Sequence, residues 1–336
     1  DDHRGIRAGE TTIATVLKQQ GYRTALIGKW HLGHTDHETL PRQHGFEHTY
    51  GSHGGCVDYF TLKYGWKPDW FRNAEPLEEE GYATDLITDE AVRYLKQHKK
   101  KDPFFMFLSY TAPHYGKGWN EETKELSNIL QAKPGDRARF KHITDTNRLE
   151  YAAMVAAMDD GIGRVLKTLK RQNLDKNTLV IFTSDNGGDP RYGGNNKPFR
   201  GRKAQLFEGG IRVPCVMRWP GKIKPGSVSQ QPVIALDFFP TFAALAGAGT
   251  SGYSLDGTDI SPVLFQGKQF ERDLFWRLPN ADAFRRGNWK YVRTGKEEML
   301  FDLGNDPTES NNLAKKKPEL LRELKQAHSR VVETFK

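Results

Sequence analysis

The sequence predicts an α/β protein: a mixed, largely parallel sheet flanked by helices, followed by a smaller C-terminal antiparallel sheet with one helix. Over residues 11–246, short apolar runs alternate with stretches whose apolar side chains recur at helical spacing. A segment rich in Gly, Ser and Thr follows at 247–257, and beyond it short runs are separated by turn residues. We therefore expect an α/β domain over 1–268 and a small α+β subdomain over 269–336.

The first part of the chain should contain four helices and four strands. In the first helix, Ile13, Val16 and Leu17 share a face, and Gly21 follows its end as a typical terminator. Continuous apolar runs such as 104–108 are typical of strands buried within a sheet. The predicted helices are 11–20, 85–98, 147–170 and 236–246, and the predicted strands are 24–28, 104–108, 178–183 and 213–219.

The C-terminal part should form a small antiparallel sheet closed by a helix. Its apolar runs are short and turn residues separate them, which favours hairpins over crossovers. The predicted strands are 274–276, 283–285, 289–293 and 299–302, and an amphipathic helix covers 318–335.

Composition excludes several classes of protein. Hydrophobic residues make up 37% of the 336 residues, which is a globular composition and not that of a disordered or collagen-like chain. No apolar run approaches the ~18 residues that a membrane span requires. The net charge of +8 favours anionic partners such as sulfated or phosphorylated substrates, acidic lipid or nucleic acid. We expect no nucleic acid, because the sequence shows no stacking-aromatic motif or recognition helix. Two cysteines exclude a disulfide scaffold, although one bridge is possible.

Polar clusters follow three of the predicted strands. Lys29-Trp-His31 follows the strand at 24–28, Pro113-His114 follows 104–108, and Asp185-Asn186 follows 178–183. Ligands bind at the carboxyl ends of strands in α/β sheets, so these clusters are expected to converge.

Each cluster has a chemical interpretation and a structural alternative. Asp185 and Asn186 offer the hard oxygen ligands that Ca²⁺ or Mg²⁺ prefers, but Asp-Asn-Gly is also common in turns. His114 can donate a proton to a leaving group, or it is a satisfied structural histidine. Arg202 and Lys203 can hold an anionic ester, or they belong to a solvated basic loop.

Histidines at 31, 34 and 37 suggest a zinc site by their spacing alone. We reject that interpretation, because Gly33 interrupts the stretch and no carboxylate or cysteine completes a ligand set at a known spacing.

Long segments of the chain resemble the signature segments of the sulfatase family, in family order. The first is Gly21-Tyr-Arg-Thr-Ala-Leu-Ile-Gly-Lys-Trp-His31. The others are Thr111-Ala-Pro-His114, Thr183-Ser-Asp-Asn-Gly187, Gly201-Arg-Lys203 with Glu208-Gly-Gly-Ile-Arg-Val-Pro214, and residues 302–313. The resemblance spans nearly the whole chain. It implies a fold of the alkaline phosphatase superfamily and hydrolysis of sulfate esters.

The resemblance also implies roles for the matching positions. Asp185 and Asn186 are similar to two ligands of the active-site Ca²⁺, with Mg²⁺ as an alternative. Lys29 and Lys203 are similar to the lysines that bind the sulfate oxygens. His31 is similar to the histidine that hydrogen-bonds the nucleophile and helps to break down the sulfated intermediate, and His114 to the histidine that assists the leaving alcohol. Export to the periplasm, lysosome or medium is carried over by analogy.

One departure from the family pattern is large. The family's nucleophile is a formylglycine made from Cys or Ser in Cys/Ser-X-Pro/Ala-X-Arg, and no such segment occurs in the 336 residues. Cys56 precedes Val-Asp-Tyr-Phe and Cys215 precedes Val-Met-Arg-Trp. Asp1-Asp2 do not match the family's metal-binding aspartate pair. We expect that the nucleophile and part of the metal shell belong upstream of residue 1, and that this chain alone is inactive.

The substrate is expected to be a sulfated carbohydrate rather than a steroid or small aryl sulfate. Residues 48–69, with His53, Asp58, Tyr59, Tyr64 and Trp66, and residues 115–119 mix aromatic and polar side chains in a way that suits a sugar ring, unless these aromatics merely pack the loops. Two other functions stay open: a phosphodiesterase or phosphonate hydrolase of the same superfamily, and a non-catalytic anion- or glycan-binding relic. The sequence does not determine the oligomeric state.

Overall fold

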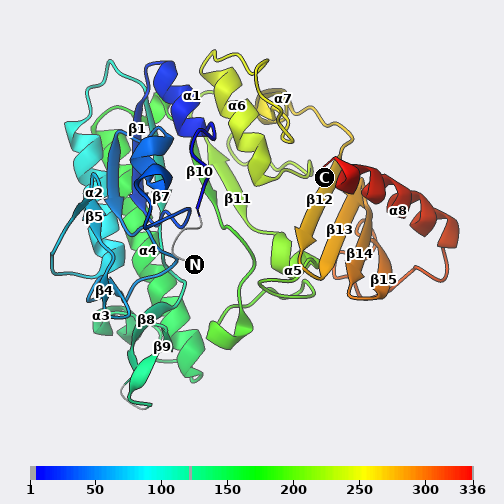
Figure 1. Ribbon diagram of the computed structural model, residues 1–336, viewed down its shortest axis with the longest axis horizontal. Coiled ribbons are helices and arrows are strands. Elements are labelled where there is room, and N and C mark those ends of the chain that lie inside the picture. Colours follow the sequence, from blue (N-terminus) through cyan, green and yellow to red (C-terminus); the bar gives the residue numbers. More distant parts are fainter. Residues whose placement is uncertain (1–4, 121–122, 335–336) are drawn as a thin grey trace. The chain divides into compact units, whose positions relative to one another are not determined.

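The computed structural model describes residues 5–120 and 123–334. Contacts divide the chain into two compact units: Asp1–Leu179 with Trp219–Lys268 (unit 1), and Val180–Arg218 with Gln269–Lys336 (unit 2). Figure 1 labels their elements. Asp1 and Asp2 lie outside the described residues. The two-domain division at residue 268 stays a prediction.

Unit 1 is built on a mixed five-stranded sheet in the order β6-β5-β2-β1-β7. The central strand β1 pairs in parallel with β2 and β7, with Ala25 beside His48 and Met106. The short strands β5 and β6 add antiparallel pairs at the other edge. The strands are β1 (Arg23–Gly28), β2 (His48–Gly51), β5 (Phe71–Arg72), β6 (Glu75–Pro76) and β7 (Phe104–Ser109). The mixed α/β sheet is therefore confirmed.

Helices flank this sheet (Figure 1). Helix α2 lies against β1 and β2 and packs on α4, while α1 lies against β1 and packs on α6. Ala14 of α1, Leu26 of β1, Trp30 and Phe46 form one buried cluster. The helices are α1 (Ile13–Gln19), α2 (Ala83–Gln97), α3 (Pro134–Ala138), α4 (Thr146–Arg171), α6 (Phe238–Leu245) and α7 (Ser261–Gln266).

Two small hairpins complete unit 1. Strands β3 (Lys63–Tyr64) and β4 (Lys67–Pro68) form the first, and β8 (Gly116–Asn120) and β9 (Glu125–Ile129) form the second. Figure 1 shows β8 and β9 extending away from the main sheet. No helix in the described part of the chain is long and apolar enough to cross a membrane.

Unit 2 contains a two-stranded and a four-stranded sheet. Strand β10 (Val180–Thr183) pairs antiparallel with β11 (Cys215–Arg218), and the short helix α5 (Glu208–Ile211) precedes β11. The sequence predicted a buried strand at 178–183, which is wrong in its burial: Phe182 is 40% exposed. A sheet of only two strands buries little of either face, so the Phe182 side chain stays exposed. Cys215 on β11 and the buried Cys56 are both free thiols.

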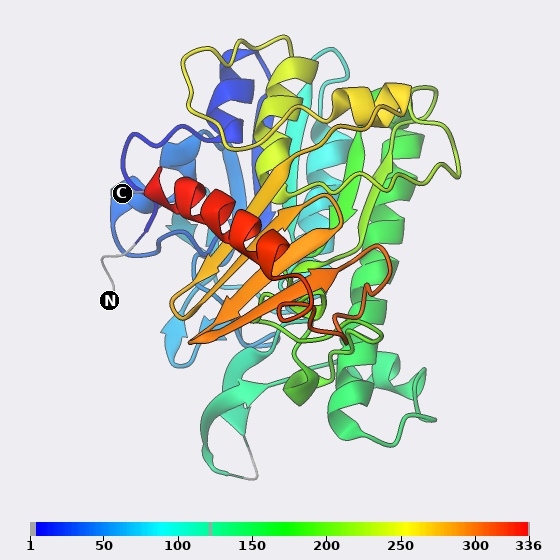
Figure 2. The same ribbon diagram turned by 90° about the vertical axis from the view of Figure 1, so that its right-hand side faces the viewer.

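The C-terminal sheet is an antiparallel meander with one helix across it, as predicted (Figure 2). Its elements are β12 (Asp273–Leu278), β13 (Ala281–Arg286), β14 (Trp289–Thr294), β15 (Glu297–Asp302) and α8 (Pro318–Glu333). Phe284, Tyr291 and Leu300 pack against Leu324 and Ala327 of α8.

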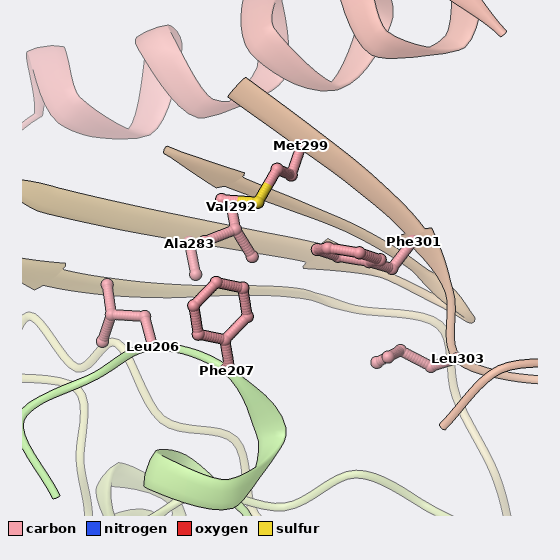
Figure 3. Close-up of a cluster of buried hydrophobic side chains, with 7 residues drawn as sticks. All are labelled: Leu206, Phe207, Ala283, Val292, Met299, Phe301 and Leu303. Carbon is pink, nitrogen blue, oxygen red and sulfur yellow. The ribbon is translucent and has the colours of Figure 1, made fainter. Parts of the chain in front are cut away.

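The other face of this sheet covers a segment from the middle of the chain. Figure 3 shows Leu206 and Phe207 packed beneath Ala283, Val292 and Phe301. Alternate residues of a strand point to opposite faces, which is why Phe284 meets α8 while Ala283 meets Phe207. The sheet thus anchors the loop that carries Lys203.

Candidate active site

The loop after β1 is fixed between the ends of the two strands that flank it. The Lys29 N–H donates to the Ser109 carbonyl at 2.9 Å, and the Ser109 hydroxyl donates back to the Lys29 carbonyl at 2.7 Å. The Trp30 and His31 N–H groups donate to the Ser52 and His53 carbonyls, both at 2.9 Å. Because β1, β2 and β7 are parallel, their carboxyl ends meet at one edge, and Lys29 and His31 lie there.

Close backbone approach and a buried indole define this loop further. Gly28 has φ +120°, and a Cβ there would lie 2.0 Å from the Ser109 carbonyl oxygen, so no side chain fits. The Trp30 indole is buried and donates to the Thr39 carbonyl at 2.9 Å. The loop thus buries Trp30, whereas the next residue, His31, is exposed and has a φ of 60°.

Gly55 lies directly against the His31 ring. A Cβ on Gly55 would be 2.5 Å from His31 Nε2 and 2.9 Å from its Cε1. No local pattern predicts this contact, because Gly55 lies 24 positions after His31 along the chain.

We expect Gly55→Ala to displace the His31 imidazole, because no atom can stay that close to a methyl group. Because the His31 side chain is exposed and can move aside, the free energy of unfolding should change by only about 0.5 kcal/mol. Imidazole NMR signals report the displacement, and Gly135→Ala is the control, since nothing lies within 4 Å of a Cβ on Gly135. Unchanged His31 signals in Gly55→Ala would contradict the contact.

His114 follows β7 and is oriented by backbone groups. Its Nδ1 lies 2.8 Å from the Tyr115 carbonyl oxygen, which can only accept, so Nδ1 carries the hydrogen. The Tyr59 hydroxyl donates to the His114 carbonyl at 2.8 Å. With Nδ1 holding its hydrogen, Nε2 is the nitrogen that takes up and releases a proton.

His53 and Asp69 hold the backbone segment that contacts the His31 loop. Asp69 accepts the His53 and Gly54 N–H groups at 3.0 and 2.9 Å. The His53 ring stacks on Phe71 with ring centroids 4.1 Å apart. Burial lowers the pKa of His53 to about 4 and raises the pKa of Asp69 to about 6. The two groups are therefore packing elements that hold the turn on which His31 rests.

The predicted substrate loop at 48–69 is divided by the structure. His53, Asp58 and Tyr59 are buried, so they pack the loop and are not available to a sugar. Tyr64 and Trp66, by contrast, are 48% and 71% exposed.

In unit 2, the turn after β10 lies beside the loop that carries Lys203. The Lys203 N–H donates to the Gly188 carbonyl at 3.2 Å, and the Gly187 N–H donates to the Gly210 carbonyl at 2.9 Å. A Cβ on Gly187 would lie 1.9 Å from the Gly209 carbonyl oxygen, so the two chain segments touch at glycine. Asp185, Asn186 and Lys203 are therefore gathered within one unit.

Asn196 holds these two segments together, and no motif in the sequence pointed to it. Its side chain accepts from the Gly188 N–H at 2.8 Å and donates to the Gly188 and Gly201 carbonyls at 2.8 and 3.2 Å. Arg202, which the sequence offered as an anion ligand beside Lys203, instead lies 3.5 Å from the Asp189 carboxylate. Hydrogen bonds from Arg191 hold the pKa of Asp189 below its usual range.

The donor chemistry of Asp185 and Asn186 fits a hard cation, but their number is too small for a complete site. Both side chains carry oxygen atoms that can coordinate a metal ion, and both residues follow the end of β10. The Asn186 backbone N–H donates a hydrogen bond to Asp185 Oδ1 at 3.0 Å. Ca²⁺ takes six to eight oxygen ligands. Among the described residues, no three His, Cys, Asp or Glu side chains are grouped to hold a metal ion. These two residues can form part of a shell.

A buried charge cluster attaches the Lys203 loop to the C-terminal sheet. Lys290 Nζ lies 2.8 Å from Glu208 Oε1 and 2.9 Å from Glu309 Oε1, and all three side chains are at most 2% exposed. The Glu208 N–H donates to Glu309 Oε2 at 2.6 Å. The guanidinium of Arg200 lies 4.0 Å above the Phe207 ring and donates to the Glu309 carbonyl at 3.2 Å.

Comparison with known proteins identifies the family. The family profile described as Sulfatase matches residues 2–248, and one described as N-sulphoglucosamine sulphohydrolase, C-terminal, matches 200–334. The chain belongs to the sulfatase family. It is 33% identical to mouse N-acetylgalactosamine-6-sulfatase over 339 residues, covering 92% of the chain and 60% of that relative. The human N-acetylgalactosamine-6-sulfatase is 32% identical, with 91% and 64% covered.

Solved structures agree with this assignment. The crystal structure of Ps i-CgsB in complex with k-i-k-neocarrahexaose has a TM-score of 0.88 and 32% identity, covering 98% of this sulfatase chain and 76% of the other. The complex of BT4656 with D-glucosamine-2-N,6-O-disulfate has a TM-score of 0.73 at 23% identity, covering 99% and 84%, and supports the fold alone. The sulfatase chain thus spans about 60% of the first mouse relative's length.

Proposed function

We propose that this chain forms the larger part of a hydrolase of carbohydrate sulfate esters, acting with a nucleophile from a segment outside the 336 residues. The observation that carries the proposal is the fixed loop of Lys29 and His31. Three backbone hydrogen bonds tie it to the ends of β7 and β2, at the edge where His114 follows β7. Membership of the sulfatase family supplies the reaction class.

The proposed roles follow from charge and proton affinity. Sulfuryl transfer spreads negative charge over the sulfate oxygens, and Lys29 and Lys203 would neutralise it. His114 would donate its Nε2 proton to the leaving alcohol, because Nδ1 is engaged by the Tyr115 carbonyl. His31 would exchange a proton on the nucleophile's side. Asp185 and Asn186 would supply part of a Ca²⁺ shell, and a bound divalent cation would offset further negative charge.

A segment outside these residues would also complete the sheet edges. None of the 336 residues forms the Cys/Ser-X-Pro/Ala-X-Arg pattern from which formylglycine is made. Strand β7 is the outermost strand of its sheet, and its Phe107 is 48% exposed. Phe182 of β10 and Val216 of β11 are 40% and 60% exposed. Within each unit, these exposed apolar side chains are surfaces that a further segment of the chain would cover.

We infer that the substrate is a sulfated galactose-type sugar. The curated relatives include N-acetylgalactosamine-6-sulfatases, and the 32% identical Ps i-CgsB was crystallised with a neocarrahexaose. The net charge of +8 suits a polyanionic glycan. Export to the periplasm, lysosome or medium stays a prediction.

Sulfate release tests the proposal. The 336-residue chain alone should release no sulfate from galactose 6-sulfate or a neocarrahexaose, whereas the parent polypeptide with its upstream segment should release it. In the parent, Lys203→Ala should lower kcat/KM by about 100-fold or more, by analogy with the loss of other transition-state charge ligands. Exposed Lys197, on the same loop, provides the control Lys197→Ala.

Three results would contradict it. Sulfate release by the 336-residue chain would show that the nucleophile is within it. A parent that cleaves phosphate diesters but no sulfate ester would make the protein a phosphodiesterase of the same superfamily. A parent that binds the hexaose without cleaving any ester would make it a glycan-binding relic.

A further inference from the structure

Two tryptophans that the proposed chemistry does not use lie exposed beside each other on the hairpins of unit 1. Trp66, in the β3–β4 turn, is 71% exposed and Trp119, on β8, is 42% exposed. Their ring centroids are 6.0 Å apart and their planes meet at 45°. Trp66 is the most exposed aromatic side chain in the described part of the chain. Adjacent exposed indoles are uncommon on a protein surface that binds nothing.

The two hairpins hold these rings in place. The Gly65 N–H, next to Trp66, faces the Lys117 carbonyl at 3.4 Å, and β3 packs against β8. Trp119 is opposite Leu126 in the β8–β9 register, and Leu126 also lies beneath Gly65. The indoles are therefore presented by paired strands and not by a loose loop.

Three lysines lie on the same two hairpins as the tryptophan pair. Lys63 and Lys67 are exposed on the first hairpin and Lys117 is half-buried on the second. None of the three takes part in an ion pair with another described residue. Of the acids in these segments, Asp58 is buried and occupied by backbone N–H groups and Gln131, while Glu125 is exposed on the outer strand β9. Glu121 and Glu122 lie outside the described residues.

Both hairpins arise from the segments that hold His114. Strand β8 begins two residues after His114. The first hairpin begins after Tyr59, whose hydroxyl donates to the His114 carbonyl, and the Asp58 N–H donates to the Lys63 carbonyl at 2.8 Å. The aromatic and basic surface is therefore joined directly to the residue proposed to protonate the leaving alcohol.

We propose that Trp66 and Trp119, with Lys63, Lys67 and Lys117, form a subsite for the sugar units that flank the sulfated one in a sulfated polysaccharide. This inference rests on the proposed function and extends it to a polymeric substrate. The apolar C–H face of a sugar ring stacks on an indole face, and the lysines meet the sulfates of neighbouring units. Neutral glycans would lack the second contribution, so the charge pattern selects a sulfated chain.

Binding by the 336-residue chain tests this without any turnover. Calorimetry with a sulfated neocarrahexaose should show binding that weakens about 10-fold in Trp66→Ala and in Trp119→Ala, as for other stacked rings. Lys63→Gln/Lys67→Gln should weaken binding and reduce its dependence on salt. Phe265→Ala is the matched control, because Phe265 is an exposed aromatic on α7 of the same unit. Equal melting temperatures confirm that the variants are folded.

The outcomes separate this subsite from the proposed function. Unchanged hexaose binding in both tryptophan variants, or equal loss in Phe265→Ala, would overturn the subsite. Concentration-dependent dimerisation that Trp66→Ala abolishes, without hexaose binding, would also overturn it and assign the patch to a second copy. In the active parent, Trp66→Ala should raise KM for the hexaose while leaving kcat/KM for a monosaccharide sulfate unchanged. Hexaose binding through Trp66 in a parent without sulfate release would sustain the subsite and reject the proposed function.

Discussion

Replacing Lys290 by methionine is expected to lower the free energy of unfolding of unit 2 by about 3–5 kcal/mol, the usual loss when one partner of a buried ion pair is removed. Lys290 is fully buried between the Glu208 and Glu309 carboxylates, which are 2% and 0% exposed. Methionine has a similar length but no charge. The variant would leave two carboxylates buried beside each other, compensated only by Arg212, whose guanidinium lies 3.6 Å from Glu208 Oε2.

Urea unfolding measures this loss, and two further variants interpret it. Lys296→Met, at an exposed position in the β14–β15 turn, should change the free energy of unfolding little. Lys290→Met/Glu309→Gln should recover a large part of the loss, because the amide keeps an oxygen for the Glu208 N–H while removing one charge. A loss in Lys290→Met no larger than in Lys296→Met would show that the cluster carries little of the stability.

The same cluster links the stability of the C-terminal sheet to the proposed site. Glu208 opens α5, five residues after Lys203. The preceding residue, Phe207, packs against one face of the C-terminal sheet (Figure 3). A loop exposed on its outer side keeps a defined conformation only when its ends are anchored, and here a buried lysine and a phenylalanine provide the anchors. If the proposed role of Lys203 holds, loss of Lys290 should therefore also weaken sulfate binding by the parent polypeptide.

Local pattern was sufficient to predict most elements and the six candidate residues. Helical spacing in 147–170 predicted α4, and the apolar run at 104–108 predicted β7. Each of these signals is local, because the residues that form it lie close together along the chain. Lys29, His31, His114, Asp185, Asn186 and Lys203 all follow strands or lie in the segments that resemble the family. Their roles in catalysis and metal binding stay predictions.

Contacts between distant segments were not predictable in this way. Gly55 against His31, Asn196 bridging Gly188 and Gly201, and Lys290 between Glu208 and Glu309 depend on which surfaces meet, and no periodicity within one segment encodes that. The exposure of Phe182 was missed for the same reason. An apolar run shows that a strand can be buried, but not which elements cover it.

The turn beneath His31 should show two opposing pH dependences of stability. Burial lowers the pKa of His53 from 6.5 to about 4, so the unfolded chain binds the extra proton and stability is lost as the pH falls from 6.5 towards 4. Burial raises the pKa of Asp69 from 3.8 to about 6, so the folded protein binds the extra proton and stability is lost as the pH rises from 3.8 through 6. Each contribution is about 3 kcal/mol at ~1.4 kcal/mol per pKa unit. They nearly cancel in the native protein.

Single substitutions should expose the two contributions separately. In Asp69→Asn, the free energy of unfolding should fall by about 3 kcal/mol, relative to the native protein, between pH 6.5 and 4, because His53 is unopposed. In His53→Asn it should rise by a similar amount over that range, because Asp69 is unopposed. Comparing slopes with pH, and not absolute stabilities, removes the fixed cost of lost packing against Phe71 and of lost hydrogen bonds.

Exposed groups of the same kinds provide the controls. Asp256→Asn and His142→Asn, both at exposed positions of unit 1, are the control variants. NMR titration gives an independent measurement, since the His53 imidazole should stay neutral until the pH approaches about 4. Parallel pH profiles for the native protein and both single variants would mean that His53 and Asp69 are not buried as described. The turn that contacts His31 would then not be held by side chains buried away from water.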